Sequence, residues 1–196
     1  MVRIGVLALQ GDVQEHMAMV EAAGGRPVEV RTVEHLKGVD GLILPGGEST
    51  TIGGLMARYG LDEAIRERVR WGFPLFGTCA GLILMAVEAL GGEPPLLGVL
   101  DVTVHRNAYG RQRESFEAEV EVPILGPAPL AVAFIRAPRI VRVGPNVEVL
   151  ATFRGEPVLV RQGNLLAATF HPEIAGDPRM HKFFLEGVTS WSPPAA

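Results

Sequence analysis

The sequence has one cysteine, no excess of basic residues and no long apolar run. Each of these shortages argues against one feature: a disulfide within the chain, a nucleic-acid partner or a membrane span. The single cysteine, Cys79, cannot form a disulfide within the chain. The net charge is -4 at pH 7, and only Lys37 and Lys182 are lysines among the 18 basic residues. A nucleic-acid-binding protein usually needs a basic face, so this charge balance argues against that class of partner.

Membrane insertion and secretion are not indicated either. The longest apolar run, 79–87, falls well short of the roughly 20 residues that span a bilayer. The apolar stretch 4–9 is too short for the core of a signal peptide and leads directly into Gln10-Gly11-Asp12. We therefore expect a cytoplasmic protein.

The residues that are abundant indicate a globular protein with a sizeable core. Hydrophobic residues make up 47% of the 196 residues, and charges of both signs are mixed along the chain. There is no internal repeat and no segment with the composition of a linker. We expect a single domain over residues 1–196, with a frayed tail from 190.

The first half alternates short apolar runs with helical patterns. The predicted strands are 3–9, 28–31, 41–44 and 74–77, and the predicted helices are 13–23, 52–59, 62–71 and 80–90. This alternation favours a parallel sheet with helices on both faces.

The second half has a different pattern. Several of its runs alternate apolar and polar residues, which is typical of antiparallel strands with one wet face. The predicted strands are 99–105, 115–122, 130–135, 147–153, 157–162 and 165–170, followed by a helix at 178–188. The fold class that follows is α/β: an open three-layer, mostly parallel sheet flanked by helices, with an antiparallel extension.

Cys79 lies in the segment Gly-Thr-Cys-Ala-Gly at 77–81, between an apolar strand and an apolar helix. This is the setting of a nucleophile elbow, where small neighbours permit a tight turn. A helix N-terminus favours the thiolate, and the backbone N–H of Ala80 would face an oxyanion beside the sulfur. Close packing alone also explains small residues, so the interpretation requires a partner base.

That base is predicted at the end of the strand 165–170, in His171-Pro172-Glu173. Residues i and i+2 of an extended chain project to the same side, so the carboxylate of Glu173 can reach the imidazole of His171. His171 would take the proton of Cys79, and Glu173 would hold the imidazole tautomer. Attack of the sulfur on an amide carbonyl would then form a thioester on Cys79.

The turn at 45–50, Pro-Gly-Gly-Glu-Ser-Thr, follows a buried strand and precedes a helix. Its glycines let backbone N–H groups face a cleft, and we expect Gly47 to supply the second oxyanion donor with Ala80. Two further segments, 105–112 and 134–138, carry arginines that suit a carboxylate, although each could equally be a solvated loop.

Neither a metal nor a cofactor is predicted. The histidines at 16, 35, 105 and 181 show no metal-ligand spacing with one another or with Cys79. The chain has no Walker-type loop and no Rossmann glycine fingerprint.

These motifs together resemble the class I, triad-type glutamine amidotransferases. Within that family the chain is similar to the branch formed by the glutaminase subunits of pyridoxal 5′-phosphate synthases, and the resemblance covers nearly the whole chain. It rests on the segments at 5–12, 45–51, 77–81, 106–112, 134–138 and 171–173, with Glu15-His16.

The resemblance implies a catalytic triad of Cys79, His171 and Glu173. It also implies glutamine contacts, from Gly47, Glu48, Ser49, Arg106, Ile135 and Arg136. The implied partner is a barrel-shaped synthase subunit that uses ammonia to make pyridoxal 5′-phosphate, within a large hetero-oligomer. Ammonia released into water near pH 7 becomes protonated, so we expect a protected channel and activation by docking, with Gln10 as a candidate partner contact.

Three other interpretations stay open at this point. The chain could be a stand-alone hydrolase, such as a γ-glutamyl hydrolase or a DJ-1-like cysteine protein on a related sheet. It could be the glutaminase subunit for another pathway, such as imidazole glycerol phosphate synthesis. It could also be a non-catalytic binding protein that keeps the fold, although no member of the triad is missing.

Overall fold

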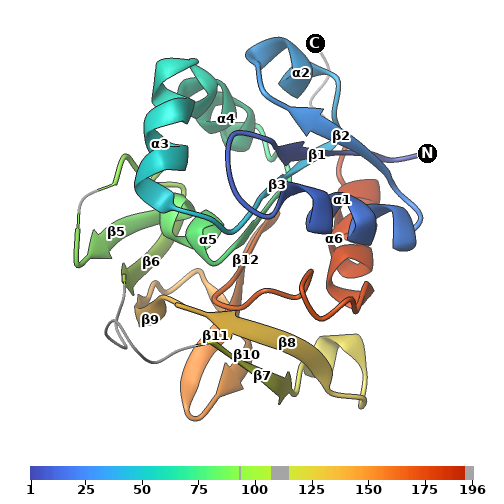
Figure 1. Ribbon diagram of the computed structural model, residues 1–196, viewed down its shortest axis with the longest axis vertical. Helices are drawn as coiled ribbons and strands as arrows, with labels where there is room; N and C mark the ends of the chain where they lie inside the picture. The colour runs from blue at the N-terminus through green and yellow to red at the C-terminus, as the bar shows by residue number, and fades with distance from the viewer. Residues whose placement is uncertain (93, 107–114, 193–196) are drawn as a thin grey trace.

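A seven-stranded sheet forms the centre of the computed structural model, which describes residues 1–92, 94–106 and 115–192 (Figure 1). Its strands are β1 (Arg3–Leu7), β2 (Arg26–Val30), β3 (Gly41–Leu44), β4 (Leu75–Thr78), β10 (Glu148–Phe153), β11 (Glu156–Gln162) and β12 (Leu165–Ala168). The order across the sheet is β10-β11-β12-β4-β3-β1-β2. The five strands from β12 to β2 run parallel, and β11 and β10 extend the edge antiparallel, as the sequence predicts.

Helices cover both faces of this sheet. They are α1 (Val13–Ala22), α2 (Val33–Lys37), α3 (Ser49–Arg58), α4 (Leu61–Arg70), α5 (Ala80–Met85) and α6 (Arg179–Ser190). Successive side chains of a strand point to opposite faces. Accordingly Ile43 packs with residues of α1 and α6, whereas Leu42 and Leu44 pack with residues of α2 to α5. Figure 1 shows α1 and α6 side by side, away from α3 and α4.

Two small sheets are added to this frame. One contains β5 (Ala86–Leu90), β6 (Leu100–His105) and β9 (Arg139–Val143), and the other is the hairpin of β7 (Ser115–Val120) and β8 (Leu130–Ile135), with a 3-10 turn at Pro123–Leu125. Val132 and Phe134 of the hairpin are buried in the same cluster as Phe76 and Phe170. The hairpin and the main sheet therefore share one core.

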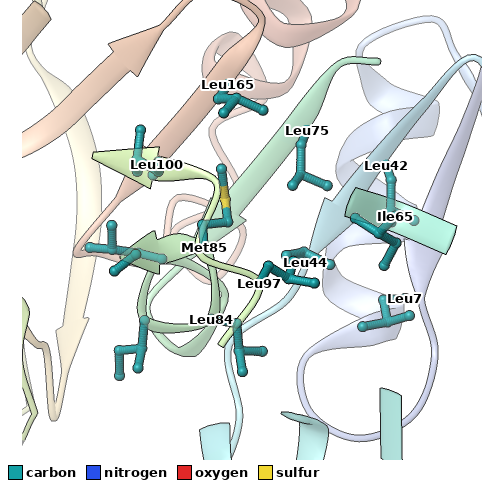
Figure 2. Close-up of a cluster of buried hydrophobic side chains, with 14 of the residues drawn as sticks. Leu7, Leu42, Leu44, Ile65, Leu75, Leu84, Met85, Leu97, Leu100 and Leu165 are labelled. Atoms are coloured by element: carbon teal, nitrogen blue, oxygen red, sulfur yellow. The ribbon is translucent and has the colours of Figure 1, made fainter. Parts of the chain in front are cut away.

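The helix α5 is buried along its whole length. Figure 2 shows Leu84 and Met85 of α5 among Leu44, Leu75, Leu97, Leu100 and other leucines that belong to one hydrophobic cluster. The packing fixes the end of the helix whose beginning carries Cys79.

The predicted helix 80–90 is wrong in its second half. The helix ends at Met85, and residues 86–90 form β5, which pairs with β6. The carbonyl groups of Leu84 and Met85 accept hydrogen bonds from the backbone N–H groups of Leu97 and Val99, at 2.7 and 2.9 Å, instead of continuing a helix. The segment that leads into β6 thus takes the hydrogen bonds that a longer helix would have used.

Besides β5, three of the described elements do not appear in the sequence-based prediction: α2, β9 and the 3-10 turn. At the C-terminus α6 includes Ser190, and the ring of Trp191 packs edge-on against Phe73 with centroids 5.9 Å apart. Residue 190, the start of the tail expected to fray, is the last residue of α6, and residues 193–196 lie outside the described part. Of the helices described, none has the length and apolar character to cross a membrane.

Candidate active site

Cys79 occupies a strained turn between β4 and α5. Its φ of 50° and ψ of -104° lie in a region that residues other than glycine rarely adopt. Its backbone N–H donates to the carbonyl of Ala168 at 2.9 Å, and its carbonyl accepts from Ile83 at 3.2 Å. A Cβ at Gly81 would collide with the carbonyl oxygen of Leu44, so the close approach of α5 to β3 requires glycine there. The predicted elbow is present.

His171 follows β12 and is fixed by its backbone. It exchanges two hydrogen bonds with Ala133 of β8, at 2.7 and 3.2 Å. Its ring Nδ1 lies 2.6 Å from Oε1 of Glu173, as the spacing predicts, and 3.2 Å from Oδ2 of Asp12. Because two carboxylates meet Nδ1, Nε2 is the nitrogen that remains for Cys79, which also hydrogen bonds to this ring.

The charges around His171 favour a protonated ring. Burial lowers the pKa of His171, but the hydrogen bonds with Asp12, Cys79 and Glu173 outweigh burial and raise that pKa above its usual range. Burial also raises the pKa of Glu173, although the hydrogen bond from His171 opposes that shift. The imidazole is therefore the member of the pair that carries the proton.

Two backbone segments line the space in front of the sulfur. Ala80 is the first residue of α5, where a backbone N–H has no acceptor within the helix. Gly46 and Gly47 follow β3 on the other side, and a Cβ at Gly46 would collide with the ring of His171. Glycine at 46 thus lets the loop pack directly on the imidazole.

A cavity of about 390 Å³ opens above Cys79 at the carboxyl ends of the parallel strands, where ligands of such sheets bind. The residues that line it are Asp12, Gly47, Glu48, Ser49, Cys79, Ala80, Ile83, Arg106, Ile135, Arg136 and His171. All six predicted glutamine contacts are in this set, together with Cys79 and His171. Glu173 lies behind His171, with its side chain fully buried.

The rim of the cavity carries opposite charges. Glu48 caps α3 by accepting hydrogen bonds from the backbone N–H of Thr51 at 2.7 Å and from that of Thr50 at 3.2 Å. The hydrogen bond from the Thr51 hydroxyl is the largest cause that lowers the pKa of Glu48. Arg106 reaches the same carboxylate at 3.5 Å and the hydroxyl of Thr50 at 3.3 Å. Positions 107–112 of the arginine motif lie outside the described residues.

The opposite wall comes from the end of β8. The thiol of Cys79 donates to the carbonyl of Ile135 at 3.7 Å, and Arg136 follows with a φ of 46°. A residue other than glycine at that φ is under strain. Gln10 does not line the cavity, but its exposed side chain accepts a hydrogen bond from the backbone N–H of Glu48 at 2.8 Å.

Four residues of the site neighbourhood were not predicted: Asp12, His16, Thr78 and His181. Asp12 follows β1, which pairs with β3, so its carboxylate meets the glycine loop at the same sheet edge. His16 lies on the buried face of α1 four residues before Val20, and that spacing was visible in the sequence. His181 comes from α6, and only the tertiary structure brings it to His16.

One nitrogen of His171 and one oxygen each of Asp12 and Glu173 lie within 4.8 Å of one another, a spacing that a metal ion could use. His171 Nδ1, however, already serves both carboxylates through hydrogen bonds. This geometry favours a proton between these groups, with a thiol on the other side of the ring.

The fold together with a cysteine, histidine and carboxylate in this geometry places the chain among the glutamine amidotransferases. More particularly, the chain belongs to the SNO glutamine amidotransferase family, whose model matches residues 6–190.

Similar curated proteins have nearly the same length. The pyridoxal 5′-phosphate synthase subunit PdxT of Moorella thermoacetica is 51% identical over 186 residues, which cover 95% of this chain and 99% of the relative. The protein of the same name from Frankia casuarinae is 54% identical over 190 residues, which cover 96% of each chain.

Solved structures agree with the fold. One described as a glutamine amidotransferase superposes with a TM-score of 0.90 at 53% identity, over 95% of this chain and 98% of that one. The structure of PurLQS from Thermotoga maritima has a TM-score of 0.67 at 18% identity, over 96% of this chain and 97% of that one, and supports the fold alone.

Proposed function

We propose that the chain hydrolyses L-glutamine to L-glutamate and ammonia, and that the ammonia passes to a synthase subunit that makes pyridoxal 5′-phosphate in vitamin B6 biosynthesis. The observation that carries the glutaminase activity is the strained Cys79 beside His171, whose other nitrogen is held by Glu173 at 2.6 Å. The names of the relatives support the pathway.

The reaction proceeds in two halves. The proton of Cys79 lies on Nε2 of the protonated His171 ring, and the thiolate sulfur attacks the side-chain amide carbon. The negative oxygen that forms is stabilised by the backbone N–H groups of Ala80 and Gly47. His171 returns the proton to the nitrogen, the C–N bond breaks, and ammonia leaves a γ-glutamyl thioester. Water then attacks the thioester with His171 as base, and glutamate and the free thiol result.

Substrate recognition follows from the charges of the cavity. A free amino acid carries an ammonium and a carboxylate, and the rim offers the carboxylate of Glu48 and the guanidinium of Arg106 within 3.5 Å of each other. We assign the α-carboxylate to Arg106 and Arg136, and the ammonium to Glu48, with Ser49 and Ile135 completing the wall.

A partner subunit would complete the catalytic system. Gln10 is exposed, and its side chain holds the backbone of Glu48, next to Gly47. Contact of a partner with Gln10 would therefore act directly on the loop that supplies the second oxyanion donor. We infer that the free chain is a slow glutaminase within a larger hetero-oligomer, and that it works in the cytoplasm, where a lone thiol stays reduced.

Glutamate release from glutamine tests this proposal. The assay uses the chain alone, with the synthase subunit, and as Cys79→Ala with the synthase subunit; His35→Gln, an exposed position on α2, is the matched control. We expect hydrolysis that the synthase increases at least about tenfold, that Cys79→Ala abolishes and that His35→Gln leaves intact. Equal rates with and without the synthase would remove the partner assignment, and activity in Cys79→Ala would remove the mechanism.

A further inference from the structure

Behind Glu173 lies a pair of buried histidines that the reaction above does not use. His16 of α1 and His181 of α6 are both fully buried, and their rings lie 5.1 Å apart. Nδ1 of His16 is 2.8 Å from Nε2 of His181. On its other side, Nε2 of His16 is 3.1 Å from the hydroxyl of Thr78 and 3.6 Å from Oε1 of Glu173.

Both rings are neutral near pH 7. Burial lowers the pKa of His16, and the charges of His181 and His171 lower it further. Burial lowers the pKa of His181 to about 4. Each ring therefore carries one N–H, and only one of the two can donate in the bond between them.

The surroundings of His181 decide which of the two rings donates. Nδ1 of His181 is buried and has no hydrogen-bond partner among the described residues. If His181 accepted at Nε2, its proton would sit on that isolated Nδ1 as an unsatisfied buried donor. If Nε2 of His181 donates, Nδ1 keeps only a lone pair, which costs less to leave unpaired.

The contacts of His16 on the side of Glu173 favour the same pair of tautomers. When His181 donates to Nδ1 of His16, the proton of His16 lies on Nε2 and points toward Thr78 and Glu173. The opposite tautomer would turn a lone pair toward the carboxylate of Glu173, which is repulsive in a buried site. Both ends thus favour N–H groups aligned from α6 toward the carboxylate.

We propose that His16 is a positioning residue for the Glu173–His171 couple, and that His181 fixes His16 in the tautomer that presents its N–H to Glu173. The kinetic part of this inference rests on the proposed glutaminase activity, whereas the tautomers can be observed without any reaction.

Glu173 needs such support because its surroundings oppose its charge. Burial raises its pKa, and the charge of Asp12 raises it further, while the hydrogen bond with His171 is the main opposing influence. Its Oε2 has no hydrogen-bond partner among the described residues. The groups that face it are His171 from the segment after β12, Asp12 from the loop after β1 and His16 from α1, with Thr78 at the end of β4. Among the described side chains, His16 and His171 are the ones that can donate an N–H to the carboxylate, which also accepts from the backbone N–H of Glu173 itself.

The first test reads the tautomers directly. In the ¹⁵N-labelled chain at pH 7, the histidine nitrogen shifts and couplings should show His16 and His181 both neutral with the proton on Nε2. The assignment uses His16→Gln and His181→Gln to identify the signals. A proton on Nδ1 of His16, or a charged ring in either residue, would overturn the proposal.

The second test measures steady-state glutamine hydrolysis in the complex with the synthase subunit. His16→Phe keeps a ring and removes the donor, and we expect kcat to fall about tenfold, with KM for glutamine within about twofold of wild type. The acidic limb of the pH profile should move up by about one unit, because loss of a donor raises the pKa of a carboxylate. His16→Gln, whose amide can still donate, should restore most of kcat, and His181→Phe should show a weaker form of the same shift.

A double-mutant comparison separates positioning from simple packing. If His16 acts through Glu173, then His16→Phe costs little more once Glu173→Gln is present. Independent losses that multiply would contradict the proposal, as would equal damage from His16→Phe and His16→Gln. If His16→Phe does not fold, the same comparison is made with His181→Phe. If no complex hydrolyses glutamine, the proposed function fails, while the tautomer measurement still decides this inference.

Discussion

At the scale of single residues, the site combines strain, burial and charge within a few ångströms. Cys79 is held in a disfavoured backbone conformation by hydrogen bonds to β12 and α5. Because the backbone is fixed, the sulfur faces the cavity without sampling other main-chain conformations. His171 is held through its backbone by β8 and through its side chain by Glu173. Cys79 and His171 thus each have an external support.

Removing the charge behind His171 should lower kcat strongly. Glu173→Gln keeps an oxygen for Nδ1 but no longer stabilises the imidazolium, and we expect kcat to fall by about 10²- to 10⁴-fold with a small change in KM. Steady-state glutamate release in the presence of the synthase subunit measures this. Glu186→Gln, at an exposed position of α6, should behave as wild type. A Glu173→Gln enzyme with near-normal kcat would mean that Asp12 supplies the charge instead.

The sequence predicted the residues whose relation is local and missed those whose relation is tertiary. His171 and Glu173 are two positions apart on extended chain, and Cys79 sits in a recognisable strand-turn-helix, so local spacing was sufficient. Asp12 reaches His171 only because β1 pairs with β3. His181 reaches His16 only because α1 and α6 cover the same face of the sheet.

At the scale of elements, α5 shows how packing defines the site. It is short and buried on all sides, and Gly81 allows it to approach the carbonyl of Leu44. A helix buried all round has no amphipathic periodicity, and this explains why its end at Met85 could not be read from the sequence. The amphipathic helix α4 and the parallel strands, by contrast, were predicted to within two residues.

A matched pair of glycine substitutions tests the packing of α5. Gly81→Ala should lower the free energy of unfolding by about 1–3 kcal/mol, since its Cβ collides with backbone that cannot move freely. Gly54→Ala lies in α3 with open space around it and should raise stability by about 0.5–1 kcal/mol through helix propensity. Urea unfolding of both variants measures the difference, and similar stabilities would show that α5 can shift without cost.

At the scale of the whole molecule, neutral histidines in the core couple folding to pH. Unfolded histidine has a pKa near 6.5, whereas burial holds the pKa of His181 at about 4 and lowers that of His16 as well. Below pH 6.5 the unfolded chain binds more protons than the native chain, so stability falls as the pH decreases toward 4. The raised pKa values of His171 and Glu173 work in the opposite direction over part of that range.

We therefore predict a pH-dependent difference between the wild type and His181→Gln. Between pH 7 and pH 5 the wild type should lose about 2 kcal/mol of stability through His181 alone, and the variant should lack this contribution. Urea unfolding at the two pH values gives, for each protein, the slope of stability against pH. The effect of Glu173 on that slope is common to both proteins. His35→Gln should keep the wild-type slope, and an unchanged slope in His181→Gln would show that His181 is charged or exposed in the native state.

The strand β8 contacts several parts of the candidate site at once. Its residue 133 anchors the backbone of His171, the proposed general base, and its residue 135 accepts from the thiol of Cys79 and forms a wall of the cavity above it. This one strand therefore contacts His171, Cys79 and the wall of the cavity. A displacement of the hairpin would move the backbone of His171 and the wall at Ile135 together, whereas β12 and α5 would still hold the backbone of Cys79. Motion of the hairpin would therefore change the distance between the imidazole and the sulfur.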